Sequence, residues 1–504
     1  MAGYSKISRY SCRSVIPNFM GMMQYGDGNN IDLSYATTER NVETFGGVLQ
    51  PAAACELMEV QLDQPIETLA RLYRRWYSGD DDKEILIAAS GGKLYYMLLG
   101  ANSWTQLAMP TGVTSYSSNV WSWVTYEINP QGSSASVDVL LMSNAVDGMI
   151  MIRGDNMTVS KVTTPKKFGV IERYAERIWG GAITDDPDML VYSAPYDPTD
   201  WAANVEHPED GAGDIMQPSW DGDSFTALKA FGSQLIAFKK NRVWRVLGTD
   251  PGEYTFKEQY GGGATYPGTV AVNNEIILML SKKGPQIYDG LSVSPYKQEY
   301  CKEIWAQMNL EELDKATAVY WHNKYYCAFP LGGSKINNAV VIFNPIDGTW
   351  LIRDDVYVES FLGMDDELLF TSSTTPGRVW RWREDSWKTG ASTNEAIAWV
   401  TPWTDAGAKD IAKNGFDVYL LCEVKTEPVT LWVSIQTETK VKSRNFTVKP
   451  LSEAEIAANK WHKQKCLHFS GACRRFRLII ETQKRTAPWR LIGGVVIISD
   501  TDPD

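Results

Sequence analysis

The chain has 504 residues, 44% of them hydrophobic and 22% charged, which is the composition of a folded protein too long for a single core. Its formal net charge of −12 argues against a protein that grips nucleic acid, because phosphate binding needs clustered cations. The 19 tryptophans and 24 tyrosines suit pleated, half-buried surfaces and therefore favour β-structure.

The apolar runs of the chain are short. The start, MAGYSKISRYSCRSVIPNFMG, has no secretory h-region, and EIILML and GGVVII fall far short of the roughly 18 residues that span a bilayer. The seven cysteines, an odd number scattered from Cys12 to Cys473, do not form a disulfide framework and are typical of a reducing compartment. We therefore expect a soluble protein that is assembled in the cytoplasm and does not insert into a membrane.

Residues 1–50 are predicted to form an extended N-terminal arm. The stretch is rich in Gly, Asn and Met, and its apolar residues follow neither a helical nor a strand period. They cannot bury one another, so they need another surface. We expect the arm to dock on an adjacent subunit or another protein, with closure of its own domain as the alternative. The apolar residues are Met20, Met22, Met23, Ile31, Leu33, Phe45 and Val48.

From residue 51 to 392 one pattern recurs: an apolar run, a turn of Gly, Asn or Asp, and a second apolar run. FGSQLIAFKKNRVWRVLG (231–248) and AVVIFNPIDGTWLI (339–352) are two of seven or eight such units. Hairpins in series without helices between them exclude a parallel α/β sheet. The pattern predicts an all-β fold, a β-propeller of about six four-stranded blades, with a large twisted sandwich as the alternative. Tryptophans follow several of the turns: Trp104, Trp244, Trp350, Trp380 and Trp382.

Helical patterns are limited to residues 309–319 and 451–461. Residues 393–504 instead contain alternating apolar strands with short connections, such as FDVYLLCEV and RRFRLIIETQ. This pattern predicts a C-terminal antiparallel β-sandwich of ordinary domain size.

The sequence contains no strong catalytic signal. SGGKLYY lacks the spacing and the hydroxyl of a phosphate-binding loop, and GGGATYPG (261–268) lacks the strand and helix that flank a dinucleotide site. GDSF, at Gly222–Phe225, resembles a serine-nucleophile motif, but none of the four histidines stands in a partner motif. All three are interpreted as turns. We expect no catalytic residue, no cofactor-binding residue, no cofactor and no enzymatic activity.

Two acidic turns are the next candidates. TDDPDM contains Asp185, Asp186 and Asp188, and DDELL contains Asp365 and Asp366. Paired carboxylates on a propeller can serve a glycosidase or bind calcium. Aspartate is also common at solvated loop tips, where it bonds its own backbone, and this is the interpretation we favour.

The segment WHKQKCLHFSGAC contains His462, Cys466, His468 and Cys473. Strand alternation places Cys466 and His468 on one face, which allows tetrahedral zinc. The spacing matches no zinc module, however, and intracellular cysteines in strands are usually buried core residues. The sequence therefore predicts no metal site.

Two segments in the middle of the chain resemble a known family. VYSAPYDPTDWAANVEHPEDGAGDI (191–215) has a D-x-x-D-W stretch and a loop of glycine and acidic residues, and a strand pair follows in residues 223–248. Both are similar to the β-propeller hub, or nozzle, proteins of short-tailed bacteriophages. NNAVVIFNPIDGTWLIRDD (337–355) and AIAWVTPWTDAGAKD (396–410) resemble other pieces of such proteins. The residues that match the two segments are Asp197, Asp200, Trp201, Trp244, Val246 and Gly248.

The resemblance implies a structural virion protein that forms a six-fold ring of six-bladed propellers at the lower end of the tail. Such a ring conducts DNA during ejection and carries head–tail adaptor or portal-proximal proteins and tail fibre or receptor-binding proteins. An acidic chain is compatible with this role, because like charge lets DNA slide past without sticking. Two alternatives stay open: a propeller glycoside hydrolase or carbohydrate-binding module with exposed tryptophans, and a cytoplasmic propeller scaffold.

Overall fold

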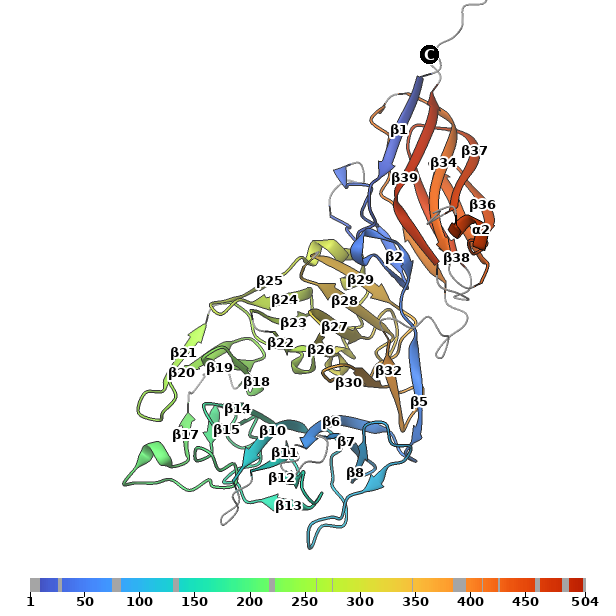
Figure 1. Ribbon diagram of the computed structural model, residues 1–504. Helices are drawn as coiled ribbons and strands as arrows, with labels where there is room; N and C mark the ends of the chain where they lie inside the picture. Colours follow the sequence, from blue (N-terminus) through green and yellow to red (C-terminus); the bar gives the residue numbers. More distant parts are fainter. Residues whose placement is uncertain are drawn as a thin grey trace, which may run out of the picture.

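The computed structural model of the chain describes residues 10–25, 30–74, 83–129, 136–216, 223–259, 261–273, 275–346, 348–383, 396–409, 411–424, 427–457, 463–482 and 489–501. Within these ranges most residues lie in strands, which build a propeller and a separate sandwich (Figure 1). No helix of this part of the chain is long and apolar enough to cross a membrane.

The described residues of the propeller form seven four-stranded antiparallel sheets, the blades, arranged around a common centre (Figure 1). The first strands of most neighbouring blades contact one another, including β30 against β6, so the blades close into a ring. Blade 1 consists of β6 (Ile66–Arg74), β7 (Lys83–Ser90), β8 (Lys93–Leu98) and β9 (Thr105–Gln106), and blade 2 of β10 (Ser122–Ile128), β11 (Val137–Asn144), β12 (Gly148–Arg153) and β13 (Val159–Val162). Blade 3 consists of β14 (Val170–Tyr174), β15 (Arg177–Gly181), β16 (Met189–Tyr192) and β17 (Gly213–Met216), and blade 4 of β18 (Phe225–Phe231), β19 (Gln234–Lys239), β20 (Val243–Leu247) and β21 (Thr255–Gln259). Blade 5 consists of β22 (Ala271–Val272), β23 (Ile277–Ser281), β24 (Gly284–Tyr288) and β25 (Val293–Pro295), and blade 6 of β26 (Thr317–Trp321), β27 (Lys324–Phe329), β28 (Ala339–Asn344) and β29 (Thr349–Arg353). Blade 7 consists of β30 (Ser360–Gly363), β31 (Leu368–Thr371), β32 (Arg378–Trp382) and β5 (Cys55–Gln61).

Blade 7 is completed by a strand from the beginning of the propeller region. β5 pairs antiparallel with β32, with Cys55 opposite Trp382 and Gln61 opposite Arg378. This pairing covers the outer edge of β32 and joins the two ends of the propeller region in one sheet.

The predicted all-β propeller and sandwich are confirmed, but the described blades number seven rather than about six. Two of the hairpin units recognised in the sequence, KYYCAFPL and AVVIFNPIDGTWLI, belong to the same sheet, blade 6. Blade 5 is short and spans only Ala271–Pro295. The eight hairpin units of the sequence therefore form seven blades. Because blade 5 is short, the propeller region holds one more blade than the length of the other units predicts.

The strands in the middle of the blades are buried on both faces, because each blade packs against two neighbours. All residues of β28 are buried. β29 is the outermost strand of blade 6, but all its residues, including Trp350, are buried as well, and the N-terminal segment contacts it through the Met22 amide. Trp244 is buried as well and stacks on Phe256, with ring centroids 5.0 Å apart. The tryptophans that follow the turns are therefore packing residues between strands and blades.

The sandwich consists of a four-stranded and a five-stranded sheet, both antiparallel. Its core contains Trp399, Phe416 and Phe476 among many aliphatic residues. The expected boundary at residue 392 lies outside the described residues. The four-stranded sheet is β1 (Tyr10–Ile16), β39 (Trp489–Thr501), β34 (Lys413–Val424) and β37 (Lys463–Cys473); the five-stranded sheet is β2 (Thr38–Arg40), β33 (Ile397–Val400), β38 (Phe476–Thr482), β35 (Val429–Thr437) and β36 (Val441–Val448).

The described part of the N-terminal segment folds onto its own chain, which corrects the expectation of an arm that docks elsewhere. β1 pairs with β39, and β2 pairs with β33, so both strands belong to the sandwich. Phe19 packs against Trp399 in the sandwich core, with ring centroids 4.8 Å apart. Met22 instead lies among buried residues of blades 5 and 6. The apolar residues show no period because they serve two different surfaces.

Polar contacts of the N-terminal segment also join the sandwich to blade 6. The amide of Met22 donates to the carbonyl of Trp350 at 3.0 Å, and Asn41 Nδ2 donates to Asp354 Oδ1 at 2.7 Å. Glu39 is buried at this junction, and neither of its carboxylate oxygens has a hydrogen-bond partner among the described residues. Burial, reinforced by Glu43, raises the pKa of Glu39 well above its ordinary value.

Helices of the described chain are short. The predicted helix at 309–319 is wrong, because this segment holds one 3-10 turn and the start of β26. The predicted helix at 451–461 has one turn among its described residues. The helical elements and the small remaining sheet are α1 (Lys302–Trp305), α2 (Glu453–Ala457), η2 (Phe45–Gly47), η3 (Pro208–Asp210), η4 (Pro267–Thr269), η5 (Gln298–Cys301), η6 (Leu313–Lys315), β3 (Val42–Glu43) and β4 (Gln50–Pro51).

Candidate functional site

The connection between β16 and β17, residues 193–212, projects from blade 3 and is here named the blade 3 insertion (Figure 1). Its two ends are held together by Arg177, whose side chain is fully buried. Arg177 Nη1 donates to the carbonyls of Ser193 at 2.8 Å and Gly211 at 2.6 Å, and Nη2 donates to the carbonyl of Glu209. Because the guanidinium presents its donors in a rigid fork, one side chain fixes the base of the whole insertion.

The residues that carry the family resemblance shape the insertion internally. Asp197 Oδ1 accepts from the backbone amide of Thr199 at 2.8 Å, and Asp200 Oδ1 accepts from the amide of Ala202 at 2.9 Å. Both are side-chain-closed turns. Trp201 packs on Phe168, with ring centroids 5.1 Å apart, and ties the insertion to the blade. The insertion is thus a pre-ordered loop.

The outer surface of the insertion combines apolar and acidic side chains. Tyr196 is 71% exposed and Val205 is 92% exposed. Glu206, Glu209 and Asp210 are exposed beside them. Large apolar side chains on an ordered, projecting loop, rimmed by charge, are typical of a protein–protein contact surface.

The other matching segment forms part of blade 4. Trp244 and Val246 are buried in β20. Gly248 has a φ of 100°, and a Cβ there would lie 2.8 Å from the carbonyl oxygen of Glu253, so the position requires glycine. Its own carbonyl accepts from the Tyr174 hydroxyl at 2.8 Å. These residues are therefore structural.

The centre of the propeller contains a channel cavity of about 970 Å³ between the first strands of blades 2 to 7. Glu172 and Lys229 face each other in it at 3.7 Å. Burial raises the pKa of Glu172, and the Lys229 charge opposes this shift. Charges of both signs meet in this channel, so its wall does not form a column of cations for phosphates.

Each mouth of the channel also carries mixed charges. One mouth, a cavity of about 430 Å³, is lined by Glu67, Lys315 and Glu359 among others. The opposite mouth, of about 950 Å³, includes Arg71 and Asp365, which form an ion pair at 2.9 Å. The channel can hold a small polar molecule or water, but its geometry selects no reaction.

The two acidic turns are not brought together. Asp186 pairs with Lys166 at 2.5 Å, and Asp188 pairs with the buried Lys239, in the turn between the second and third strands of blade 3. Asp365 lies in the turn after the first strand of blade 7. Because first and second strands run in opposite directions, the two turns lie on opposite faces of the propeller. They form no pair of glycosidase carboxylates.

The glycine-rich segments are turns, as predicted. Gly91 and Gly92 occupy the turn between β7 and β8 with φ of 57° and 75°. Residues 261–268 connect β21 with β22. Gly222 of GDSF lies outside the described residues, and the Ser224 hydroxyl donates to the carbonyl of Phe225.

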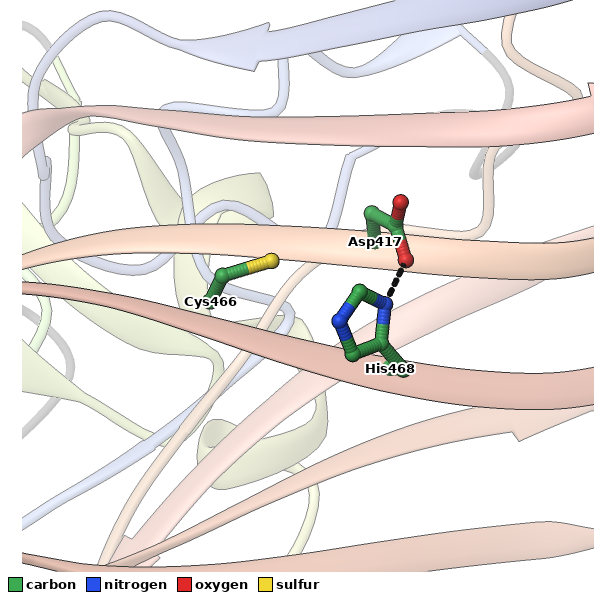
Figure 2. Close-up of side chains that lie close together, drawn as sticks. All are labelled: Asp417, Cys466 and His468. Carbon is green, nitrogen blue, oxygen red and sulfur yellow. Dashed lines mark hydrogen bonds and ion pairs between the residues drawn. The ribbon is translucent and has the colours of Figure 1, made fainter.

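The structure does not bring the four candidate ligands of the Cys/His segment together. Cys473 is buried, and its burial raises its pKa to about 11, whereas His462 lies outside the described residues. Cys466 and His468 are on the outer face of the sandwich, together with Asp417 of β34 (Figure 2). Asp417 was missed in the sequence because its partner strand could not be identified there. Its position in FDVYLLCEV, on the polar side of the alternation, was the available signal.

The comparisons with known proteins give no family. No protein-family model matches the chain, and no curated protein does. Similar solved structures include the WD40 domain of Neurospora crassa Pan2, with 9% identity over 65% of this chain and 91% of that chain, at a TM-score of 0.30. Another is BBS1N in complex with ARL6DN, with 10% identity over 66% of this chain and 97% of that chain, at a TM-score of 0.33. No function is transferred at these values, and the propeller fold rests on the sheet topology.

Proposed function

We propose that this protein is a structural component of the tail of a short-tailed bacteriophage. Copies of it form a closed ring, with six as the expected number, at the tail hub or nozzle. The ring conducts the genome during ejection and is the platform on which head–tail adaptor or portal-proximal proteins and tail fibre or receptor-binding proteins assemble.

The observation that carries the proposal is the blade 3 insertion. The segment most similar to the tail proteins is also an ordered projection with two highly exposed apolar residues, Tyr196 and Val205. Because its base and turns are already fixed, docking it on a neighbour costs little conformational entropy. A ring needs this kind of surface, in which one patch meets a different patch of the next copy.

The shape of the chain supports two sets of contacts. The sandwich and the blade 3 insertion lie at opposite ends of the molecule, with the propeller between them (Figure 1). One end can therefore contact the next copy while the other contacts a different tail protein. The net charge of −12 also suits a conduit, since a like-charged wall does not retain DNA.

The burial of the tryptophans argues against the alternative of a propeller glycoside hydrolase or carbohydrate-binding module. Trp244 and Trp350 cannot stack sugars, because both are packed inside the propeller. A structural role, without enzymatic activity and without a cofactor, is therefore what we propose.

The test compares assembly of the wild-type chain with that of the double variant Tyr196→Ser, Val205→Asp by mass photometry. We expect rings of one size for the wild type and monomers for the variant, at equal melting temperatures. Leu291→Asp is the matched control, because Leu291 is an exposed apolar residue in a turn of blade 5 and should leave assembly intact. A wild type that stays monomeric contradicts the ring, and a variant that assembles normally contradicts the role of the insertion.

A further inference from the structure

Three side chains with metal-ligand chemistry meet on the outer face of the four-stranded sheet. Cys466 and His468 lie two residues apart on the edge strand β37, and Asp417 lies on its neighbour β34 (Figure 2). The strand register fixes this arrangement, because His468 is directly opposite Asp417 and Cys466 is opposite Tyr419. Alternation along the strands then puts all three side chains on one face.

The ligand atoms of the three residues are close together. One sulfur, one ring nitrogen and one carboxylate oxygen all lie within 4.8 Å of one another. His468 Nδ1 contacts Asp417, and the thiol of Cys466 points toward the same space (Figure 2). In a tetrahedral zinc site with Zn–S of about 2.3 Å and Zn–N and Zn–O of about 2.0–2.2 Å, neighbouring ligand atoms are about 3.5 Å apart. Small side-chain rotations are enough to reach that spacing.

We propose that Asp417, Cys466 and His468 form a zinc site with one sulfur, one nitrogen and one oxygen ligand, completed by water. Mixed thiolate and imidazole ligands select a borderline-soft ion such as Zn²⁺ over Ca²⁺ or Mg²⁺, which take oxygen ligands. On binding, the S–H bond of Cys466 breaks, the sulfur bonds the metal and the proton passes to solvent. Nothing is oxidised or reduced. The proposal does not depend on the proposed tail function.

The same three residue types also occur in thiol hydrolases, where histidine activates the cysteine and aspartate orients the histidine. That use needs free backbone amides near the thiol to stabilise an oxyanion. The flanking strand β34 offers no such amides, because it is paired on both sides, with β37 and with β39. Near the thiol, free amides of the described strands are left only on the open side of the edge strand β37. His468 is 77% exposed on an open face, which suits a metal with a water ligand better than a substrate-binding cleft.

A second group, His207, Glu209 and Asp210, offers only one nitrogen and two oxygens within four residues of the blade 3 insertion. It has no thiolate and its three residues are exposed, so it serves as an internal control for weak surface binding.

The experiment titrates the full chain with Zn²⁺ by calorimetry and with Co²⁺ by absorption spectroscopy. We expect one tight Zn²⁺ per chain and a thiolate-to-cobalt charge-transfer band. Cys466→Ser should abolish the band and the tight binding. Asp417→Asn and His468→Asn should each weaken binding by more than the roughly 10- to 100-fold that loss of a ligand's hydrogen-bond partner costs, because each removes a direct ligand. Cys12→Ser, on the same sheet, and His207→Asn should leave both signals unchanged.

Because all three residues are on an outer face, the variants and the wild type should have the same melting temperature when no metal is present. The rate at which iodoacetamide alkylates Cys466 is a second measurement that does not depend on affinity. Bound zinc should slow this reaction, because it protects the thiol. Tight zinc binding that survives Cys466→Ser overturns the site, as does a cobalt spectrum without the thiolate band. Rapid alkylation that zinc does not slow and that His468→Asn abolishes would instead show Cys466 to be an activated nucleophile, and would overturn the zinc site.

Discussion

Replacement of Trp350 tests whether the hairpin tryptophans hold the propeller together. Its side chain is fully buried between blades 5 and 6 and lies 4.5 Å from the ring of Phe343 and 5.5 Å from that of Trp305, measured between centroids. Trp→Ala in a core costs about 3–5 kcal/mol. The indole N–H has no acceptor among the described residues, so its removal recovers about 1–3 kcal/mol of desolvation. We therefore expect a loss of about 2 kcal/mol for Trp350→Ala.

Trp350→Phe separates the two contributions. It keeps an aromatic ring in the cluster but removes the unpaired N–H, so its cost should be about 1 kcal/mol or less. Chemical unfolding followed by intrinsic fluorescence and thermal melts of both variants measure the difference. A Trp350→Ala variant that is as stable as the wild type but loses binding to glycans would refute the packing role and restore the sugar-platform interpretation.

The remaining predictions concern the junction, the N-terminal strand and the insertion. The raised pKa of Glu39 means that the folded chain keeps a proton that the unfolded chain releases, so stability is lost as pH rises from the ordinary value of about 4.5 toward the raised pKa. Glu39→Gln should therefore melt above the wild type at neutral pH and converge with it near pH 4.5, and parallel curves would contradict this. Deletion of residues 1–16 exposes the edge of β39 and should unfold the sandwich, seen as the loss of one thermal transition; an unchanged melt would mean that β1 is dispensable. Arg177→Met should speed proteolytic cleavage within residues 193–212 while the propeller stays folded, whereas the exposed Arg173→Met should not.

The fold was largely predictable from the sequence because the blades repeat a local pattern. Apolar runs separated by Gly and Asp turns specify hairpins such as β28–β29 without knowledge of the rest of the chain. The blade count was less accessible, because two hairpin units share blade 6 and blade 5 is short. The closure of the ring was also hidden, because β5 pairs with β32 across most of the propeller sequence. The N-terminal segment was misjudged for a similar reason. β1 pairs with β39 at the far end of the chain, and no local pattern encodes a partner at that distance.

The candidate sites show the same limit. The resemblance located the segment of the insertion, but the role of Arg177 as its anchor was invisible, since a lone arginine in a strand carries no such signal. Alternation correctly placed Cys466 and His468 on one face, whereas Asp417 entered only through the register of β34 and β37. Sequence spacing finds ligands on one strand, and strand pairing decides which residues join them.

The most direct test of the central claim is electron microscopy of the purified wild-type chain at concentrations that favour assembly. The proposed function predicts closed rings of a single symmetry, with the propellers in the ring, the blade 3 insertion at each contact between copies, and an open centre wide enough for double-stranded DNA. Isolated two-domain particles at every concentration, or open chains and stacks without closure, would contradict a tail hub.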